Sequence, residues 1–590
     1  MPVRPRCKTV RSVKQLIALA KAHPGQLNYA SVGIGSATHL SGALFNHMAG
    51  VSMMHIPYKG TGQVMPDLLG GQVALHFGST TVVPYVKTGK LVALGVSGAK
   101  RSPALPQVPT IAEKASSRSG PKSSRPRASR PSEAKERIMS QDIAKWDDTT
   151  RRLVDYARAA HYEALPELTV RECKRRVIDT FASALGAYHE PPARMARAVA
   201  SRSRGESEAS VWGSSIRTTP EAAAFANGVM VRLLDISDTY LGKSRGHPSD
   251  MTSGVLAAAE SVGADGKSVI NAIALAYDVY CSFCDAVDIN SKGWDQPVYS
   301  VLGCVLGVGR LLELTDEQMG NALSLAPNMA LAQSRRGHLS MWKGCAGANA
   351  SRNAVFAAML AKEGFTGPTA VFEGEGGLHD VVGAFEWPLP AHGHMITQTH
   401  VKSLPVCYHG QSSVLAALEL RAKIDVAKIE DIQVDAYRTA VMMMGGEPSR
   451  WAPTTRETAD HSLPYCVSIA LLDGAVTNAS FAESRLRDPV VASFMSKVKV
   501  REDAGLSAGY PEGAPGRVTI RMISGETHTL EIRYPTGHAK SPMSDEDVER
   551  KFRDMLHGQR STQQCDAALA ALNDLEHAAD VGRVIRLLAE

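Results

Sequence analysis

Residues 232–250 place several ionisable side chains directly after an apolar run at 222–234. Asp235, Asp238 and His247 lie in this polar stretch. Carboxylates and a histidine at the end of a buried helix suit proton transfer, because burial and neighbouring charges can tune their pKa values for that task. A structural role fits the same residues equally well. In that case Asp235 or Asp238 caps a helix and His247 is solvated.

Four more polar loops separate apolar segments of the chain. They carry cationic or ionisable residues at 293–297, 335–343, 402–411 and 460–465. Together with residues 235–247 they predict one polar cleft. A substrate with several carboxylates needs such a cleft, because Lys and Arg must hold its negative charges before a base can approach.

Helices are expected to position these loops. Val170, Cys173, Val177, Phe181 and Leu185 follow the helical period. Apolar helices are also predicted at 252–262, 268–285, 298–312, 316–331, 346–362, 545–556 and 563–578.

The pattern changes from about residue 398. There a helix at 412–424, a strand at 432–437, a helix at 465–472 and a hairpin at 518–523 and 527–534 are predicted. The sequence therefore indicates a helical domain, 140–397 and 538–590, that is interrupted by an α+β lid domain at 398–537.

Residues 7–115 alternate predicted helices and strands, which indicates an incomplete α/β lobe with parallel strands. The helices are expected at 13–22, 38–49 and 63–69, and the strands at 27–30, 55–58, 73–77 and 91–96. A glycine-rich turn at 33–36 precedes the second helix and is interpreted as packing the turn rather than binding a ligand.

Residues 116–139 are predicted to be a disordered basic linker, because they are rich in Ser, Pro and Arg and have no apolar period. Residues 116–138 hold seven Lys and Arg against two Glu, while the whole chain has a net charge of +6. The remainder is therefore nearly neutral, which argues against nucleic-acid binding by the folded part.

The nine cysteines show no regular spacing, and this favours a reducing compartment. Cys281 and Cys284 fall within an apolar helical run and are predicted to pack in the core. The basic N-terminus lacks the apolar stretch of a signal peptide. No apolar run long enough to span a membrane is recognised, so a cytoplasmic location without membrane contact is expected.

Two segments resemble known families. The Asp-x-x-Asp-Thr run at 235–239 and the Gly-His-Pro-Ser-Asp run at 246–250 are similar to the signature of the MmgE/PrpD family, and most closely to its 2-methylcitrate dehydratase branch. This resemblance covers residues 140–590. The N-terminal lobe instead resembles about a third of the Bug solute-binding proteins of tripartite tricarboxylate transporters. The matching runs include Pro-Gly-Gln-Leu-Asn-Tyr at 24–29 and Ile-Pro-Tyr-Lys-Gly at 56–60.

The MmgE/PrpD resemblance implies a helical domain with an inserted lid and a homodimer. It also implies a cofactor-independent carbon–oxygen lyase, without a metal, that dehydrates 2-methylcitrate or a similar tricarboxylate. Such a lyase needs a base for the proton alpha to a carboxylate, an acid for the departing hydroxyl and cations around the carboxylates. The predicted catalytic residues are Asp235, His247, His409 and Tyr465. The predicted substrate-binding residues are Thr239, Asp295, Arg336, Lys343, Lys402 and Gln411. Arg335, His338 and His461 are expected to have structural roles.

Other reactions stay open. The chain has Asp295 and Cys407 where the cis-aconitate decarboxylases of the same family carry histidines, and its Tyr-His-Gly-Gln at 408–411 is closer to the dehydratase Phe-His-Ala-Gln. A decarboxylase or an epimerase is therefore the alternative. A non-catalytic tricarboxylate-binding protein is the alternative of another class.

Overall fold

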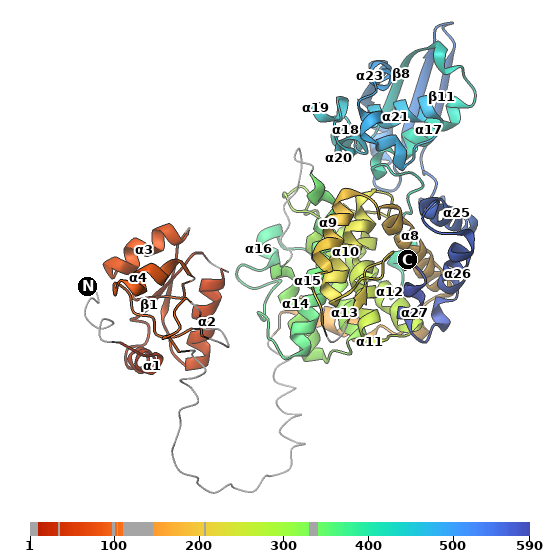
Figure 1. Cartoon of the computed structure of the whole chain (residues 1–590). Coiled ribbons are helices and arrows are strands. Elements are labelled where there is room, and N and C mark those ends of the chain that lie inside the picture. Colours follow the sequence, from red (N-terminus) through yellow and green to blue (C-terminus); the bar gives the residue numbers. More distant parts are fainter. Residues whose placement is uncertain are drawn as a thin grey trace. The chain divides into compact units, whose positions relative to one another are not determined.

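The computed structural model divides the chain into two compact units, Met1–Ser129 and Arg130–Glu590 (Figure 1). It describes residues 10–33, 36–58, 60–78, 80–96, 101–102, 104–109, 146–205, 208–329 and 340–589. The linker expected at 116–139, part of the glycine-rich turn and Arg336 lie outside the described residues.

The first unit has a parallel three-stranded sheet with strand order β2-β1-β3. The strands are β1 (Asn28–Ser31), β2 (Met54–Pro57) and β3 (Leu75–His76), and the helices are α1 (Val13–Ala22), α2 (Ala37–Ala49), α3 (Thr61–Gly70) and α4 (Val83–Lys87). The parallel pairing agrees with the prediction. The strand predicted at 91–96 is wrong. Those residues are partly or fully exposed, and the structure assigns them no strand. Val96 alone is assigned an isolated bridge, and its N–H donates to the Pro109 carbonyl oxygen at 3.0 Å.

The second unit is mainly helical, as predicted. Its larger part contains α7 (Asp148–Ala159), α8 (Glu167–Gly186), α9 (Pro191–Ala200), α10 (Pro220–Leu233), α11 (Thr252–Val262), α12 (Gly266–Ala286), α13 (Pro297–Leu311), α14 (Asp316–Met329), α15 (Ala346–Lys362) and α16 (Leu378–Val382). The periodic residues Cys173, Val177, Phe181 and Leu185 of α8 are buried. Cys281 and Cys284 are fully buried on α12, as expected.

The chain returns to this helical part at its C-terminal end. The last helices are α25 (Asp545–Leu556), α26 (Thr562–Asn573) and α27 (Val581–Arg586), which Figure 1 shows in blue beside α8. Lys551 of α25 pairs with Asp179 of α8 in a buried contact. The packing therefore joins segments that are far apart in the sequence.

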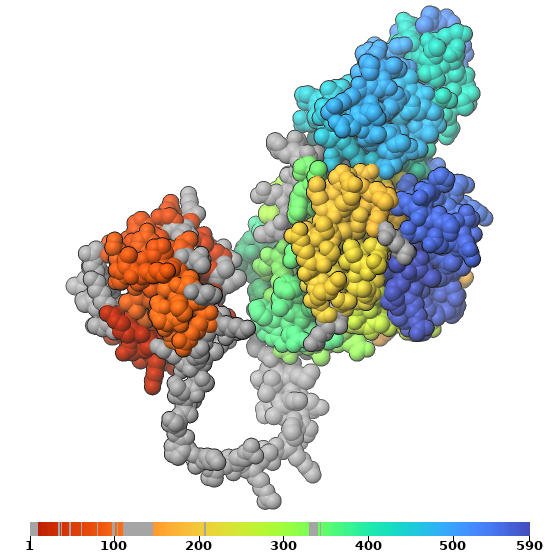
Figure 2. Space-filling view, in the orientation of Figure 1, coloured from red at the N-terminus to blue at the C-terminus, as the bar shows by residue number. Residues whose placement is uncertain are grey.

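Residues between these two helical parts form a mixed sheet with strand order β11-β10-β8-β9. The strands are β8 (Ile429–Ala436), β9 (Val498–Glu502), β10 (Gly516–Met522) and β11 (Thr527–Ile532), and the longer helices are α17 (Gln411–Arg421), α18 (Arg438–Met444), α21 (Leu463–Asp473) and α23 (Pro489–Met495). The predicted hairpin is β10–β11, and its strands are antiparallel. Figure 2 shows this segment, in turquoise to blue, as a separate bulge on the helical body. We refer to it as the lid.

The buried apolar residues of the lid lie between Val406 and Met522. Together with Leu241 of the helical part they form a hydrophobic cluster, which is separate from the cluster of the helical part. The helical part and the lid therefore each have a core of their own. Within the part of the chain that the structure describes, one helix, α12, is apolar and long enough to cross a membrane, although no such run was expected. Its apolar window is 89% buried within the protein, as in the core helix of a globular domain.

Candidate functional site

A tight turn after α10 aims the carboxylate of Asp235 at the junction between the helical part and the lid. Pro220 starts the helix, where its missing N–H is not needed, and the helix ends at Leu233. Asp235 then has a φ of 53°, in the left-handed region. Aspartate tolerates this region better than most residues, because its short polar side chain can make local hydrogen bonds.

Two buried cations hold this carboxylate. Arg232 Nη1 lies 2.5 Å and Lys402 Nζ 2.6 Å from Asp235 Oδ1, and Lys402 also donates to the Asp235 carbonyl oxygen at 2.8 Å. Burial lowers the pKa of Lys402 although Asp235 attracts its charge. Burial likewise opposes the charge of Arg232, but Asp235 and Asp250 outweigh it and raise the pKa of the guanidinium.

His247 lies on the same side of Asp235, with its Nε2 4.0 Å from Oδ1. Its Nδ1 lies 2.7 Å from the Asp238 carbonyl oxygen. A carbonyl only accepts, so Nδ1 must carry the proton and Nε2 is left with its lone pair. Burial, with the charges of Arg232 and Lys402, holds the pKa of His247 well below its ordinary value. The ring is therefore a neutral base near neutral pH.

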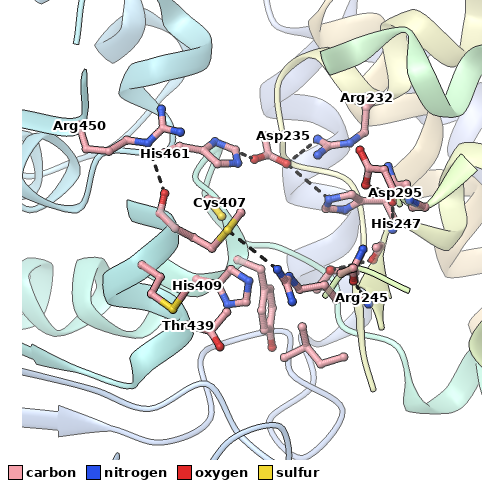
Figure 3. A pocket seen from close by; sticks show the side chains of 18 of the residues that line it. Arg232, Asp235, Arg245, His247, Asp295, Cys407, His409, Thr439, Arg450 and His461 are labelled. Carbon is pink, nitrogen blue, oxygen red and sulfur yellow. Dashed lines mark hydrogen bonds and ion pairs between the residues drawn. The ribbon is translucent and has the colours of Figure 1, made fainter. Parts of the chain in front are cut away.

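The second oxygen of Asp235 faces the lid. His461 Nδ1 lies 3.7 Å from Asp235 Oδ2 and 2.5 Å from Asp460 Oδ1. Cys407 is beside His461, as Figure 3 shows. Burial favours the neutral thiol of Cys407, but His461 outweighs this effect and lowers the pKa of the thiol.

These groups line a cavity of about 420 Å³ between the helical part and the lid. Its cationic side chains are Arg232, Arg245 and Arg450. Its other lining residues are Asp235, Thr239, Leu241, Gly246, His247, Asn290, Asp295, Gln296, Cys407, Tyr408, His409, Thr439, Met442, Met443, Glu447 and His461. The cavity thus combines arginine side chains with apolar lid residues, and this combination suits an organic anion.

One set of side chains has the geometry to approach a metal ion. Asp235, Cys407 and His461 each offer a ligand atom, and these atoms lie within 4.8 Å of one another. However, Asp235 already pairs with Arg232 and Lys402. Two cations in direct contact with the carboxylate oppose a third, so the arrangement favours an anion over a metal.

Comparison with known proteins gives the family. The MmgE/PrpD N-terminal domain matches residues 151–387, and the MmgE/PrpD C-terminal domain matches residues 404–576. The chain belongs to the MmgE/PrpD family. The tripartite tricarboxylate transporter receptor family matches residues 3–141.

Several curated members of the MmgE/PrpD family are similar to this chain. The 2-methylcitrate dehydratase of Escherichia coli K12 is 28% identical over 358 residues, which are 56% of this chain and 74% of that protein. The same enzyme of Cupriavidus necator is 26% identical and covers 72% of this chain and 92% of its own length. The human cis-aconitate decarboxylase is 25% identical and covers 73% of this chain and 93% of its own length.

The N-terminal segment has relatives of another kind. A solved structure entitled "R. palustris Rpa4515 with adipate" is 40% identical, with a TM-score of 0.18, over 18% of this chain and 36% of that chain. The periplasmic binding protein BugD is 38% identical, with a TM-score of 0.18 and the same coverage. The chain therefore spans about a third of the length of these proteins.

Five of the predicted residues of the MmgE/PrpD site line the cavity. These are Asp235, Thr239, His247, Asp295 and His409. Lys402 reaches the site through its contact with Asp235. The His409 Nδ1 contacts the Tyr437 hydroxyl, and burial with the charge of Arg245 keeps the pKa of His409 well below its usual value.

Like Lys402, two other predicted residues do not line the cavity. The Tyr465 hydroxyl donates to the Ser480 carbonyl oxygen at 2.6 Å. The Gln411 amide donates to the carbonyl oxygens of Leu404 at 2.8 Å and Val406 at 2.9 Å. Both contacts stabilise lid backbone. The side chain of Lys343, like Arg336, lies outside the described residues.

Five lining residues that carry chemistry were not among the predicted site residues: Arg232, Arg245, Cys407, Arg450 and His461. Arg232 precedes Asp235 by three residues at the end of a helix, and this spacing was a usable signal. His461 was expected to be structural because nothing in its local sequence shows that Asp235 is close. Arg450 lies in a short lid helix, α19 (Pro448–Trp451), which has no marked pattern.

Proposed function

We propose that this chain is a cofactor-independent carbon–oxygen lyase that dehydrates 2-methylcitrate or a similar tricarboxylate. The observation that carries the proposal is the neutral His247, whose Nε2 lies beside the Asp235 carboxylate at the cationic cavity. Two similar curated enzymes, a 2-methylcitrate dehydratase and a cis-aconitate decarboxylase, act on acids of this class by their names, which supports the substrate class.

The chemistry follows from this geometry. His247 Nε2 takes the proton from a carbon alpha to a carboxylate, and the electron pair of that C–H bond forms the new double bond as the neighbouring hydroxyl leaves. The carbon acid is weak, so the carboxylate next to it must be held by cations as charge builds up. Asp235 Oδ1, which lies 4.0 Å from His247 Nε2, then stabilises the imidazolium that forms.

The cavity can supply those cations. Among the described residues, Arg232 Nε and Arg450 Nη1 are buried nitrogens without a hydrogen-bond partner. A buried guanidinium N–H that lacks a partner costs free energy, which a ligand carboxylate can recover. Together with Arg245 they suit a substrate with more than one carboxylate.

A decarboxylase is the second candidate, because the human cis-aconitate decarboxylase matches over most of its length. Asp295 and Cys407, where that branch carries histidines, count against it. The test is an assay of the purified chain with 2-methylcitrate, citrate and cis-aconitate. Formation of a conjugated double bond, seen as ultraviolet absorbance, supports the dehydratase. Carbon dioxide release from cis-aconitate supports the decarboxylase, and binding without turnover supports a binding protein.

The same proposal includes a cytoplasmic homodimer that forms through the helical part. Large apolar side chains are exposed there, including Met195 and Val199 on α9 and Phe356 on α15. Light scattering at micromolar concentration should give twice the 63.1 kDa chain mass. A mass of one chain would contradict the dimer.

A further inference from the structure

Cys407 lines the cavity, but the roles of the base and of the cations leave this thiol without a function. The two oxygens of Asp235 divide the site: Oδ1 faces Arg232, Lys402 and His247, and Oδ2 faces His461. An elimination needs a second proton-transfer group besides its base. The candidates for this second proton-transfer group lie on the Oδ2 side of Asp235.

The lid backbone fixes Cys407 next to His461. The Cys407 N–H donates to the Asp460 carbonyl oxygen at 2.9 Å, although the two residues come from different loops. Asp460 also contacts the His461 ring with its carboxylate. The Asp460 carboxylate therefore lies behind the His461 imidazole, and the imidazole and the Cys407 thiol lie at the cavity. This is the arrangement in which a carboxylate orients an imidazole that activates a thiol.

The electrostatic surroundings support an activated thiol. Cys407 is only 6% exposed, and burial would by itself raise its pKa. His461 and Lys402 reverse that effect and lower the pKa. The neighbouring lid thiol Cys466 has no such partner set, and burial raises its pKa well above the ordinary value. The difference belongs to the position of Cys407, not to buried cysteines of the lid in general.

Arg450 completes this half of the cavity. It lines the cavity, is 5% exposed, and its buried Nη1 has no hydrogen-bond partner among the described residues. Burial lowers the pKa of the Arg450 guanidinium, and the charges of Cys407, Asp460 and Glu447 act against that shift. A ligand carboxylate bound to Arg450 would bring its carbon chain to Cys407.

We propose that Cys407 is the proton donor of the dehydration, that Asp460 and His461 control its protonation, and that Arg450 holds a substrate carboxylate beside it. This inference rests on the proposed function. As the C–O bond breaks, its electron pair stays on the oxygen, and the Cys407 thiol gives its proton to that oxygen to form water. The proton from carbon is on His247. Afterwards His247 releases a proton to solvent and the thiolate takes one up, which restores the site.

The first experiment does not depend on turnover. The full-length protein is alkylated with iodoacetamide at a series of pH values, and modification of each cysteine is followed by mass spectrometry. We expect the pH midpoint of Cys407 to lie below that of Cys345, a partly exposed thiol. His461→Asn should move the Cys407 midpoint upward by about 1–3 pH units, since it removes the opposite charge. An equal midpoint for Cys407 and Cys345 overturns the activation.

A second arm tests the carboxylate anchor. Iodoacetate carries a carboxylate and iodoacetamide does not, so Arg450 should favour iodoacetate at Cys407. Arg450→Gln should remove this preference and leave the iodoacetamide midpoint close to that of the parent protein. No preference for iodoacetate in the parent protein overturns the role of Arg450.

The third arm measures kcat. Cys407→Ser should lose about 10²–10³-fold, because a hydroxyl is a poor proton donor at neutral pH. Cys345→Ser is the matched control and should keep the parent rate. Near-normal turnover of Cys407→Ser, with His461→Asn impaired, would assign the proton to His461 and overturn the role of Cys407. If the parent protein turns over none of the acids, the donor role falls with the proposed function, while the alkylation profile still decides whether the thiol is activated.

Discussion

The loop that follows α10 has two buried charged clusters, one on each face, and they differ in what surrounds them. The cavity cluster consists of Asp235, Arg232, Lys402, His247 and His461. The support cluster consists of Asp238, Arg176, Tyr277, Asp179 and Lys551. Each contains at least one carboxylate, an arginine and a lysine, and burial lowers the pKa of both lysines. Both clusters are largely buried, but the cavity cluster adds two histidines where the support cluster adds a tyrosine and a second aspartate.

The side chains of the support cluster form their hydrogen bonds with other groups of the protein. Asp238 accepts from the Ser249 N–H at 2.9 Å and from the Tyr277 hydroxyl at 2.9 Å. Lys551 donates to the carbonyl oxygens of Ile236 and Lys402, each at 2.8 Å. It therefore fixes the backbone on both sides of the cavity cluster.

The cavity cluster instead leaves a histidine nitrogen with its lone pair and opens on a cavity. A shifted pKa alone therefore does not identify a catalytic residue in this protein. Access to the cavity separates the two clusters.

The largest effect is expected for Asp235→Asn, which tests the cavity cluster. The rate should fall by about 10²–10⁴-fold, because the imidazolium of His247 loses its counter-charge. The variant should also lose about 3–5 kcal/mol of stability, since Arg232 and Lys402 are left buried without their partner. Steady-state kinetics and urea unfolding measure both. A folded variant with normal kcat would leave Asp235 only a structural role.

Lys551→Met tests the support cluster. It should cost about 3–5 kcal/mol of stability, because Asp179 keeps a buried charge without a partner. The kcat of the folded fraction should fall by less than about tenfold, since Lys551 acts on the backbone and not on substrate. The double variant Asp179→Asn/Lys551→Met is the control, and should recover part of the stability. A loss of rate as large as that of Asp235→Asn would erase the distinction between the clusters.

The pH dependence of kcat/KM sharpens the role of His247. A base must be deprotonated to act, and the pKa of His247 is held well below its usual value. The acid limb of the profile should therefore lie below the ordinary histidine pKa of about 6.5. Stability follows the same sign: the contribution of neutral His247 is complete above about pH 6.5 and is lost as the pH falls toward its folded-state pKa. An acid limb above pH 6.5 would exclude His247 as the base.

The smallest effect is expected for deletion of residues 1–138. The first unit is a separate compact unit, and none of the described residues that line the cavity belongs to it. The truncated protein should keep its kcat and its melting temperature. A large loss of turnover with intact circular dichroism would show that the first unit contributes to the site.

Local sequence determined much of the fold. The helical period of α8, the apolar runs of α11 and α15 and the β10–β11 hairpin depend on neighbours within one element, so the pattern shows them directly. The run at 91–96 has the pattern of a strand, but among the described residues it joins no sheet, and pattern alone cannot supply a partner strand. The sequence also placed Asp235, Thr239, His247, Asp295 and His409 together, because each lies in a motif between apolar helices.

Tertiary structure alone decided which of these groups meet. Lys402 reaches Asp235 across 167 positions of the chain, and Lys551 reaches Asp179 across 372. His461, Arg450 and Cys407 approach the cavity only because the lid folds against the helical part. Tyr465 and Gln411 lie in motifs that predicted a site role in the same way, but their side chains donate hydrogen bonds to backbone carbonyl oxygens. Side-chain direction depends on three-dimensional packing, and local spacing does not encode it.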